Sequence, residues 1–295
     1  MRFLLTLLVA FAITTPAFAQ SPKENEELAM AALEGLMAQP SERALPIIKK
    51  VLAGNQTSIV KRRALFVLSQ IDSAEAQQIL IQTTRSTDAT MRAEAIRSIG
   101  IGGDPKSLEA LQDIYKTGGP EQKEEVLQAW MIAGRKDLVF QAALNAKDEE
   151  EANQAIRMLG VMGAAEELRK LGDRPNAASG LVEAYAISGD LASLRKIAEG
   201  NGSAEVRAEA VRKMGIIGND AARTALRDIY ARTTDEEVKE AALQGLLMSG
   251  DEQGLLELYR ASKNPEEKRS LLRYLSMMDG DAALQAIDAA LEGKL

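Results

Sequence analysis

Acidic residues gather in three short clusters whose carboxylates have the right type for acid–base chemistry. The clusters are Asp148 to Glu151, Asp235 to Glu237, and Glu266 with Glu267. Paired carboxylates are the usual machinery of glycoside hydrolysis. However, the helix dipole favours acids in the first turn of a helix, and these clusters recur at repeated positions, where a single active site would not. We therefore interpret them as helix starts, and we predict no catalytic residue and no metal ligand.

The residue types that catalysis uses most often are missing from the chain. Its 295 residues include no His and no Cys. The usual general base, the Ser–His and Cys–His nucleophile pairs and the commonest transition-metal ligands are therefore absent. Carboxylates, Lys, Tyr and Ser remain, so a lyase or hydrolase that uses carboxylates or tyrosines in a groove stays open as an alternative. We expect no cofactor.

Three tyrosines and two arginines have the spacing of a partner-binding surface. Tyr115, Tyr230 and Tyr259 each follow an Ile or Leu that already continues an apolar face, so we expect them at its margin. Arg223 and Arg227 share one helix face with Tyr230 by i, i+4, i+7 spacing. Tyr and Arg are enriched at binding hot spots, so we predict that these five residues bind a partner. The alternative is a tyrosine that seals the junction between two units.

An internal repeat positions these residues. A small or aliphatic residue is followed by an aliphatic one and, three residues later, by a large apolar one, which is one face of a helix. The triplets are Ala32-Leu33-Leu36, Ala64-Leu65-Leu68, Ala95-Ile96-Ile99, Val126-Leu127-Trp130, Ala155-Ile156-Leu159, Leu181-Val182-Tyr185, Ala210-Val211-Met214, Ala242-Leu243-Leu246 and Leu271-Leu272-Leu275. Nine units with a period near 30 residues indicate a repeat architecture. Trp130 and Tyr185 stand at the third triplet position, so we assign both to the core.

Each unit is predicted to contain two helices. Gly followed by Asp or Asn ends the first helix and caps the second, at Asp104, Asp190, Asn219, Asp251 and Asp281. A second set of capping residues stands seven positions before the triplet, at Thr57, Asp88, Asp148, Ser203, Asp235 and Asn264. No alternating β-branched runs occur. The sequence therefore predicts an all-α solenoid of about eighteen short helices.

A basic residue also recurs three positions before the triplet, at Lys61, Arg92, Lys123, Arg207, Lys239 and Lys268. Such a row could hold an acidic ligand. We favour the structural interpretation, in which each cation pairs with an acid of its own unit or of the next one. One unit is short, because only 26 residues separate Ala155 from Leu181. Its second helix is predicted to be little more than Glu166 to Leu171, and Pro175 restarts the chain; the sequence leaves open whether the stretch from Leu171 to Gly180 has a function.

The run VRAEAVRKMGIIGNDAARTALRDIY resembles the short HEAT-like repeats of the phycobiliprotein-lyase type. The resemblance extends essentially from Glu24 to Leu291 and implies an α-solenoid whose second helices line a concave surface. It is unspecific for function, because such repeats serve adaptors, scaffolds and lyase subunits.

The N-terminal sequence indicates export. MRFLLTLLVAFAITTPAFAQ has one positive residue, an apolar run too short to span a bilayer, and an Ala17-Phe18-Ala19 cleavage signature. We predict a signal peptide at residues 1–19, cleaved after Ala19, and a periplasmic or secreted solenoid at residues 20–295. After cleavage we expect no stable membrane insertion. The net charge of −7 argues against nucleic acid as a partner.

Together these features predict an exported, non-enzymatic scaffold that holds a protein or peptide on a concave surface. A purely structural spacer remains a further alternative.

Overall fold

A computed structural model describes residues 22–172 and 178–292, and these residues form helices and short connections without a strand. The helices are α1 (Pro22–Leu36), α2 (Ser41–Ala53), α3 (Ser58–Ser69), α4 (Ala74–Thr83), α5 (Ala89–Gly102), α6 (Pro105–Thr117), α7 (Pro120–Ile132), α8 (Lys136–Leu144), α9 (Glu149–Val161), α10 (Ala165–Leu171), α11 (Ala178–Ser188), α12 (Leu191–Ala198), α13 (Ala204–Ile217), α14 (Asp220–Arg232), α15 (Glu236–Met248), α16 (Glu252–Ala261), α17 (Pro265–Leu275) and α18 (Asp281–Leu291). The prediction of an all-α solenoid is confirmed. The predicted signal peptide and Pro175 lie outside the described residues.

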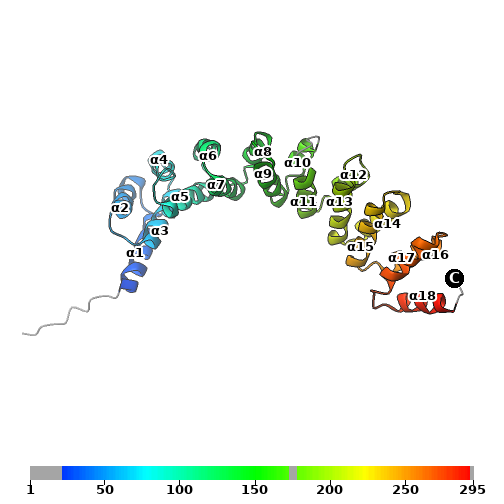
Figure 1. Ribbon diagram of the computed structural model, residues 1–295. Helices are drawn as coiled ribbons and strands as arrows, with labels where there is room; N and C mark the ends of the chain where they lie inside the picture. Colours follow the sequence, from blue (N-terminus) through cyan, green and yellow to red (C-terminus); the bar gives the residue numbers. More distant parts are fainter. Residues whose placement is uncertain (1–21, 173–177, 293–295) are drawn as a thin grey trace, which may run out of the picture. The chain divides into compact units, whose positions relative to one another are not determined.

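The chain divides into two compact units, residues 1–98 and residues 99–295, and each is described by itself. In both, an odd-numbered helix, here called a first helix, is followed by an even-numbered second helix (Figure 1). None of the helices in the described ranges is long and apolar enough to cross a membrane.

The core lies between the layer of first helices and the layer of second helices. All three side chains of the seven triplets from Ala64 to Leu246 are buried, Trp130 and Tyr185 among them. The terminal units are less complete: Ala32 is exposed and Leu272 is half-buried. Among the described residues, each of these two units has a neighbouring unit on one side only, so part of its apolar face has no described partner.

Local capping sets where the helices begin. All six predicted caps of the first helices accept a hydrogen bond from a backbone N–H of the first turn: Thr57, Asp88, Asp148, Ser203, Asp235 and Asn264. Four of the five predicted second-helix caps do the same: Asp104, Asp190, Asn219 and Asp251. The prediction for Asp281 is wrong, because this residue is the first of α18. Glu252, from α16, accepts the bond from the N–H of Ala283 instead, at 2.6 Å.

Small residues let some first helices approach one another closely. A Cβ atom added to the glycine would lie 2.4–2.8 Å from the Cα atom across the junction at three pairs: Gly100 with Ala129, Gly160 with Ala184, and Gly215 with Gly245. These junctions are α5–α7, α9–α11 and α13–α15, which is every second junction. At the junctions between them, larger residues hold the equivalent positions, such as Met131 and Met158 in α7 and α9. The close approaches therefore group the units in pairs.

The spacing between neighbouring helices also decides which layer lies on the inner side of the second compact unit, residues 99–295. At most junctions there, neighbouring first helices pack more closely than neighbouring second helices. A two-layer stack curves toward its more closely spaced layer, so the first helices line the inner side (Figure 1). The expectation that second helices line the concave surface is therefore wrong for this unit. The short unit is confirmed: its second helix, α10, has seven residues.

Candidate functional site

The three tyrosines predicted to bind a partner lie in the interior. Tyr115, Tyr230 and Tyr259 are only 3–6% exposed. For Tyr115 and Tyr259 the expectation of a position at the margin of the apolar face is not met, because each is buried while the preceding Ile114 or Leu258 is only half-buried. The ring of Tyr115 packs against Trp130, with 5.4 Å between the ring centroids. This placement matches the alternative in which a tyrosine seals a junction between units.

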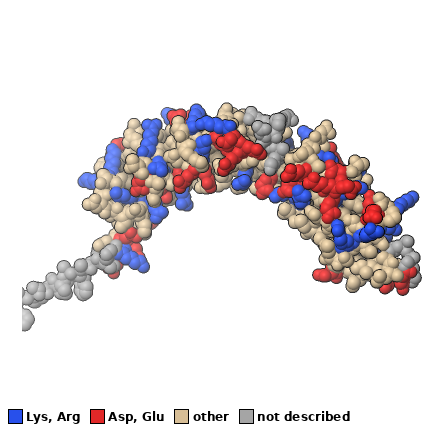
Figure 2. All heavy atoms as spheres, in the orientation of Figure 1, with Lys and Arg blue, Asp and Glu red and all other residues tan. Residues whose placement is uncertain are grey.

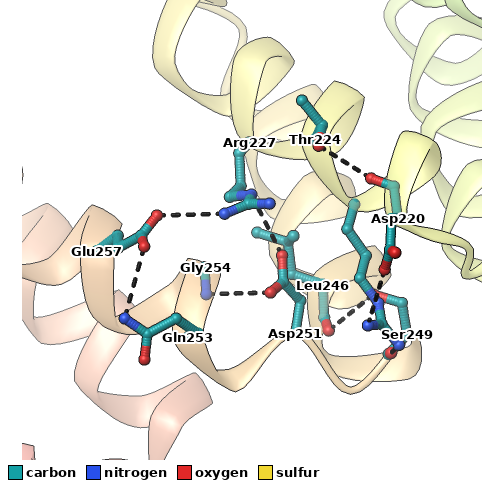
Figure 3. Close-up of polar contacts among 10 residues, drawn as sticks. Asp220, Thr224, Arg227, Leu246, Ser249, Asp251, Gln253, Gly254 and Glu257 are labelled. Atoms are coloured by element: carbon teal, nitrogen blue, oxygen red, sulfur yellow. Dashed lines mark hydrogen bonds and ion pairs between the residues drawn. The ribbon is translucent and has the colours of Figure 1, made fainter.

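The two predicted arginines connect consecutive units. Arg227 reaches from α14 to both Asp251, at 3.3 Å, and Glu257, at 3.2 Å (Figure 3). Arg223 donates a 2.6 Å hydrogen bond to the carbonyl oxygen of Ser249 at the end of α15. Both guanidinium groups therefore already have partners within the chain. The partner-binding role of these five residues stays a prediction, which their burial and pairing do not favour.

The row of cations before the triplets also joins neighbouring units. Three of them pair with an acid at the start of the next first helix: Lys123 with Glu151 at 2.8 Å, Arg207 with Asp235 at 3.5 Å, and Lys239 with Glu267 at 2.8 Å. Arg92 donates to backbone carbonyl groups, and Lys268 lies over the ring of Tyr259. The predicted pairing with an acid is therefore found for Lys123, Arg207 and Lys239, whereas Arg92 and Lys268 contact backbone carbonyl groups and an aromatic ring instead. For Lys61 no side-chain partner is found among the described residues.

The acidic clusters serve the helix starts. Glu151 is buried beside Lys123, and the ammonium group of Lys123 lies 5.7 Å from the ring centre of Tyr115. Burial first, and then the Glu151 carboxylate, raise the pKa of Tyr115, so its hydroxyl stays protonated at neutral pH. Tyr115, Lys123 and Glu151 thus connect α6, α7 and α9, and the tyrosine hydroxyl does not act as a base.

Within the described ranges, no group of three or more acids is arranged to hold a metal ion.

A row of exposed apolar side chains lies at the C-terminal ends of the first helices of the second unit, with its last member just beyond the end of α17. We call it the apolar row; it consists of Ile101, Ile132, Val161, Ile187, Ile216, Met248 and Met277. Each residue stands six positions after the start of its triplet. Their exposed fractions run from 36% to 61%, although all are large aliphatic or Met side chains. The row occupies the same position in seven successive units.

Two further rows, which we call the polar row and the glutamate row, lie on the same face as the apolar row. The polar row stands two positions after the triplet start: Gln128, Arg157, Glu183, Arg212, Gln244 and Arg273. The glutamate row stands five positions before it: Glu121, Glu150, Glu205, Glu237 and Glu266, all exposed. Glutamate, polar and apolar positions follow each other at intervals of seven and four residues, which places them on one stripe of each helix, opposite the buried triplet. We call this stripe, repeated over α7 to α17, the first-helix face.

The first-helix face is hollowed between α9, α11 and α13. The hollow has a volume of about 560 Å³, and Arg157, Glu205 and Arg212 are among its lining residues. Residue 180 in the lining of this hollow is a glycine, so it contributes no side chain there. A Cβ atom at this position would lie 2.2 Å from the Oδ1 atom of Asn153. Figure 2 shows charged side chains of both signs over the second unit, with acidic ones gathered over α13 and α14.

Comparison with protein families identifies the repeat. The family model for HEAT repeats matches residues 51–130 and 137–247, more than half of the chain. The chain belongs to the HEAT repeats family. A comparison with curated proteins gives no significant match.

Three solved structures are similar to this HEAT repeat chain at low identity. Human deoxyhypusine hydroxylase is 15% identical, with 78% of this chain and 99% of that chain covered and a TM-score of 0.34. An engineered protein is 18% identical, with 92% and 90% covered and a TM-score of 0.36. The complex of CpcE and CpcF of phycocyanin lyase from Nostoc sp. PCC7120 is 17% identical, with 99% and 100% covered and a TM-score of 0.31. At these scores the similarities carry no functional argument.

The apolar row was not among the residues that the sequence pattern singled out. The signal is nevertheless present in the HEAT repeat frame, because a large apolar residue stands six positions after the triplet start in seven consecutive units. Such a residue directly before a helix stop is easily taken for the end of the core face. Its exposure becomes visible only when the helix is placed against its neighbours.

Proposed function

We propose that this HEAT repeat protein is an exported, non-enzymatic scaffold that holds a protein partner on the first-helix face of its second unit. The observation that carries the proposal is the apolar row. Single exposed apolar residues are ordinary on protein surfaces. A contiguous set of large apolar residues, rimmed by charged ones, is typical of an interaction surface. Here the set repeats at one position over seven units.

The alternative of an enzyme in the groove requires free carboxylates that face each other. The hollow does contain three glutamates, but Lys213 binds Glu183 at 2.6 Å and also lies 3.5 Å from Glu209. Glu209 in addition accepts a 2.9 Å bond from Arg212. Two of the three carboxylates are thus already neutralised, which supports binding over catalysis as the function of this face.

The binding proposal is tested with a variant of the apolar row and a control variant elsewhere on the surface. One variant replaces Ile187, Ile216 and Met248 by Ser; the control replaces Leu284 by Ser, because Leu284 is similarly exposed but lies on α18. Both changes affect exposed side chains, so both proteins are expected to fold normally. Proteins retained by the wild type and the control, but lost by the triple variant, are identified, and their dissociation constants are then measured.

The expected loss follows from the side chains removed. Fully burying one large apolar side chain contributes about 1.5–3 kcal/mol. These three side chains are 44–61% exposed, so about half of that gain is still available and a partner gains roughly 2–4 kcal/mol from them. The triple variant should therefore bind roughly 30-fold more weakly or worse. Equal affinities for the wild type and the triple variant would contradict the proposal.

Export is proposed from the sequence of residues 1–19. If the full chain is produced in a bacterium, the processed protein should appear in the periplasmic or extracellular fraction and should begin at Gln20. Unprocessed protein that stays in the cytoplasm would contradict this part of the proposal.

A further inference from the structure

We infer that the partner segment held on the first-helix face is an amphipathic helix with a basic edge. Its apolar side lies on the apolar row, and its cationic side chains extend to the glutamate row. The inference rests on the proposed function and adds the chemistry and secondary structure of the occupant.

The dimensions of the face fit one helix that lies across the first helices. The glutamate and apolar positions are eleven residues apart on each first helix, which at 1.5 Å per residue separates the two rows by roughly 16 Å. A helix with its side chains is about 10–12 Å across, so one helix can contact the apolar row while its long basic side chains reach the glutamates. Neighbouring first helices repeat about every 8–10 Å, close to the roughly 10.5 Å that seven residues of a helix span.

Charge on the face favours a basic occupant. The carboxylates of Glu121, Glu150, Glu205 and Glu237 form no hydrogen bond or ion pair with any other described residue, and all four are exposed. In the glutamate row only Glu266 is paired, with Arg269 at 3.2 Å.

The arginines of the polar row oppose this acidity only weakly. Arg212 is held by Glu209 at 2.9 Å, and Arg273 lies 3.5 Å from Glu240. Of the three arginines in the polar row, Arg157 is the one that has no acidic partner among the described residues. The face therefore carries an excess of unpaired negative charge, which complements lysines or arginines on the occupant.

The backbone of the scaffold favours a helix over an extended segment. An extended peptide gains affinity by pairing its backbone with the edge of a sheet. The described residues offer no such edge, because their backbone groups are bonded within helices. A helix satisfies its own backbone groups and presents apolar residues at intervals of about seven, as in other helix-in-groove complexes.

The inference is tested with two synthetic peptides and the full chain. The basic probe is a fluorescein-labelled amphipathic peptide of about 28 residues, long enough for four helix repeats, with Leu on one side and Lys at its edge. The acidic probe has the same Leu residues, with Glu in place of Lys. Fluorescence anisotropy should show the basic probe binding at least about tenfold more tightly at low salt, and this advantage should shrink as salt is added. The basic probe should gain helical circular dichroism when it binds.

Charge-reversal variants of the protein show whether the preference for the basic probe comes from the glutamates of the first-helix face or from the overall negative charge of the protein. Glu205→Lys with Glu237→Lys should abolish the preference for the basic probe. The control carries Asp113→Lys with Glu166→Lys, because both acids are exposed but lie on second helices. This control should leave the preference unchanged, since it alters the net charge by the same amount.

The outcomes distinguish this inference from the proposed function. Equal affinities for the two probes, an unchanged preference after reversal of Glu205 and Glu237, or binding without helix formation would each overturn the inference. If any of these occurs while Ile187, Ile216 and Met248 are still required for the captured partner, the inference fails and the proposed function stands. If the apolar-row variant retains its partner fully, both fail.

Discussion

Replacing Gly215 by Ala tests whether close approach of the first helices holds the second unit together. Gly215 lies in α13, and a Cβ atom there would be 2.4 Å from the Cα atom of Gly245 in α15. The obstacle is backbone, so α13 and α15 must separate by about 1 Å to restore an ordinary contact. Overpacking of this kind costs typically 1–3 kcal/mol, and a rigid backbone neighbour places the cost toward the upper end.

A compensating gain comes from the helix itself. Ala is favoured over Gly in a helix interior by about 1 kcal/mol. The net expectation for Gly215→Ala is therefore a loss of roughly 1–2 kcal/mol in the free energy of unfolding. Gly245→Ala should cost less, because its new Cβ atom first meets the side chain of Leu226, which can rotate away.

Gly35 provides the matched control, because a Cβ atom there would meet nothing within 4 Å. Gly35→Ala should be neutral or stabilising by up to about 1 kcal/mol. Urea unfolding followed by circular dichroism at 222 nm measures all three variants; the midpoints are compared directly, because repeat arrays can depart from two-state behaviour. If Gly215→Ala is as stable as Gly35→Ala, the proposed role of the close approach is refuted.

Three further predictions concern caps and titrating groups. Asp235→Ala should lower the free energy of unfolding by about 1–2 kcal/mol in urea, because Asp235 caps α15 through two backbone N–H groups; an unchanged midpoint would contradict this. Burial, then the nearby acids, raise the pKa of Tyr230 to about 12, above an ordinary value of about 10. Its contribution to stability is therefore complete below about pH 10 and lost as the pH rises toward 12, and Tyr230→Phe should flatten alkaline unfolding in that window. Hydrogen bonds from Lys239 and then Ser262 lower the pKa of Glu267, so its contribution is present above about pH 4.3 and lost as the pH falls through the lowered pKa. In Lys239→Met, carbon-detected NMR should show the Glu267 pKa move up toward its ordinary value; no movement would contradict the assigned cause.

The helices and their starts could be predicted because the determining interactions are local. Thr57 or Asp148 caps the helix that it precedes, within three residues, so the residue type at one position suffices. Asp281 shows where prediction from local residue types fails. The acid that caps α18 is Glu252, which lies 31 positions away from Ala283 and becomes adjacent only when the units stack. No local rule contains that information.

The site was harder to predict because it too depends on contacts between residues that are far apart in the sequence. The types of Arg227 and Tyr230 suit a binding surface, yet stacking pairs the arginine with Asp251 and buries the tyrosine. Ile216 looks like the last residue of a core face, and stacking leaves it 61% exposed. Which layer faces inward depends on close contacts such as Gly215 with Gly245, which are properties of pairs of units.

The most direct test of the account is methyl NMR of the second unit during titration with a captured partner. Ile187 and Ile216 report on the first-helix face, and Ile114 and Ile197 report on the second helices α6 and α12. The account predicts that the methyl resonances of Ile187 and Ile216 shift and saturate together, while those of Ile114 and Ile197 stay in place. Shifts confined to Ile114 and Ile197 would contradict the assignment of the binding face.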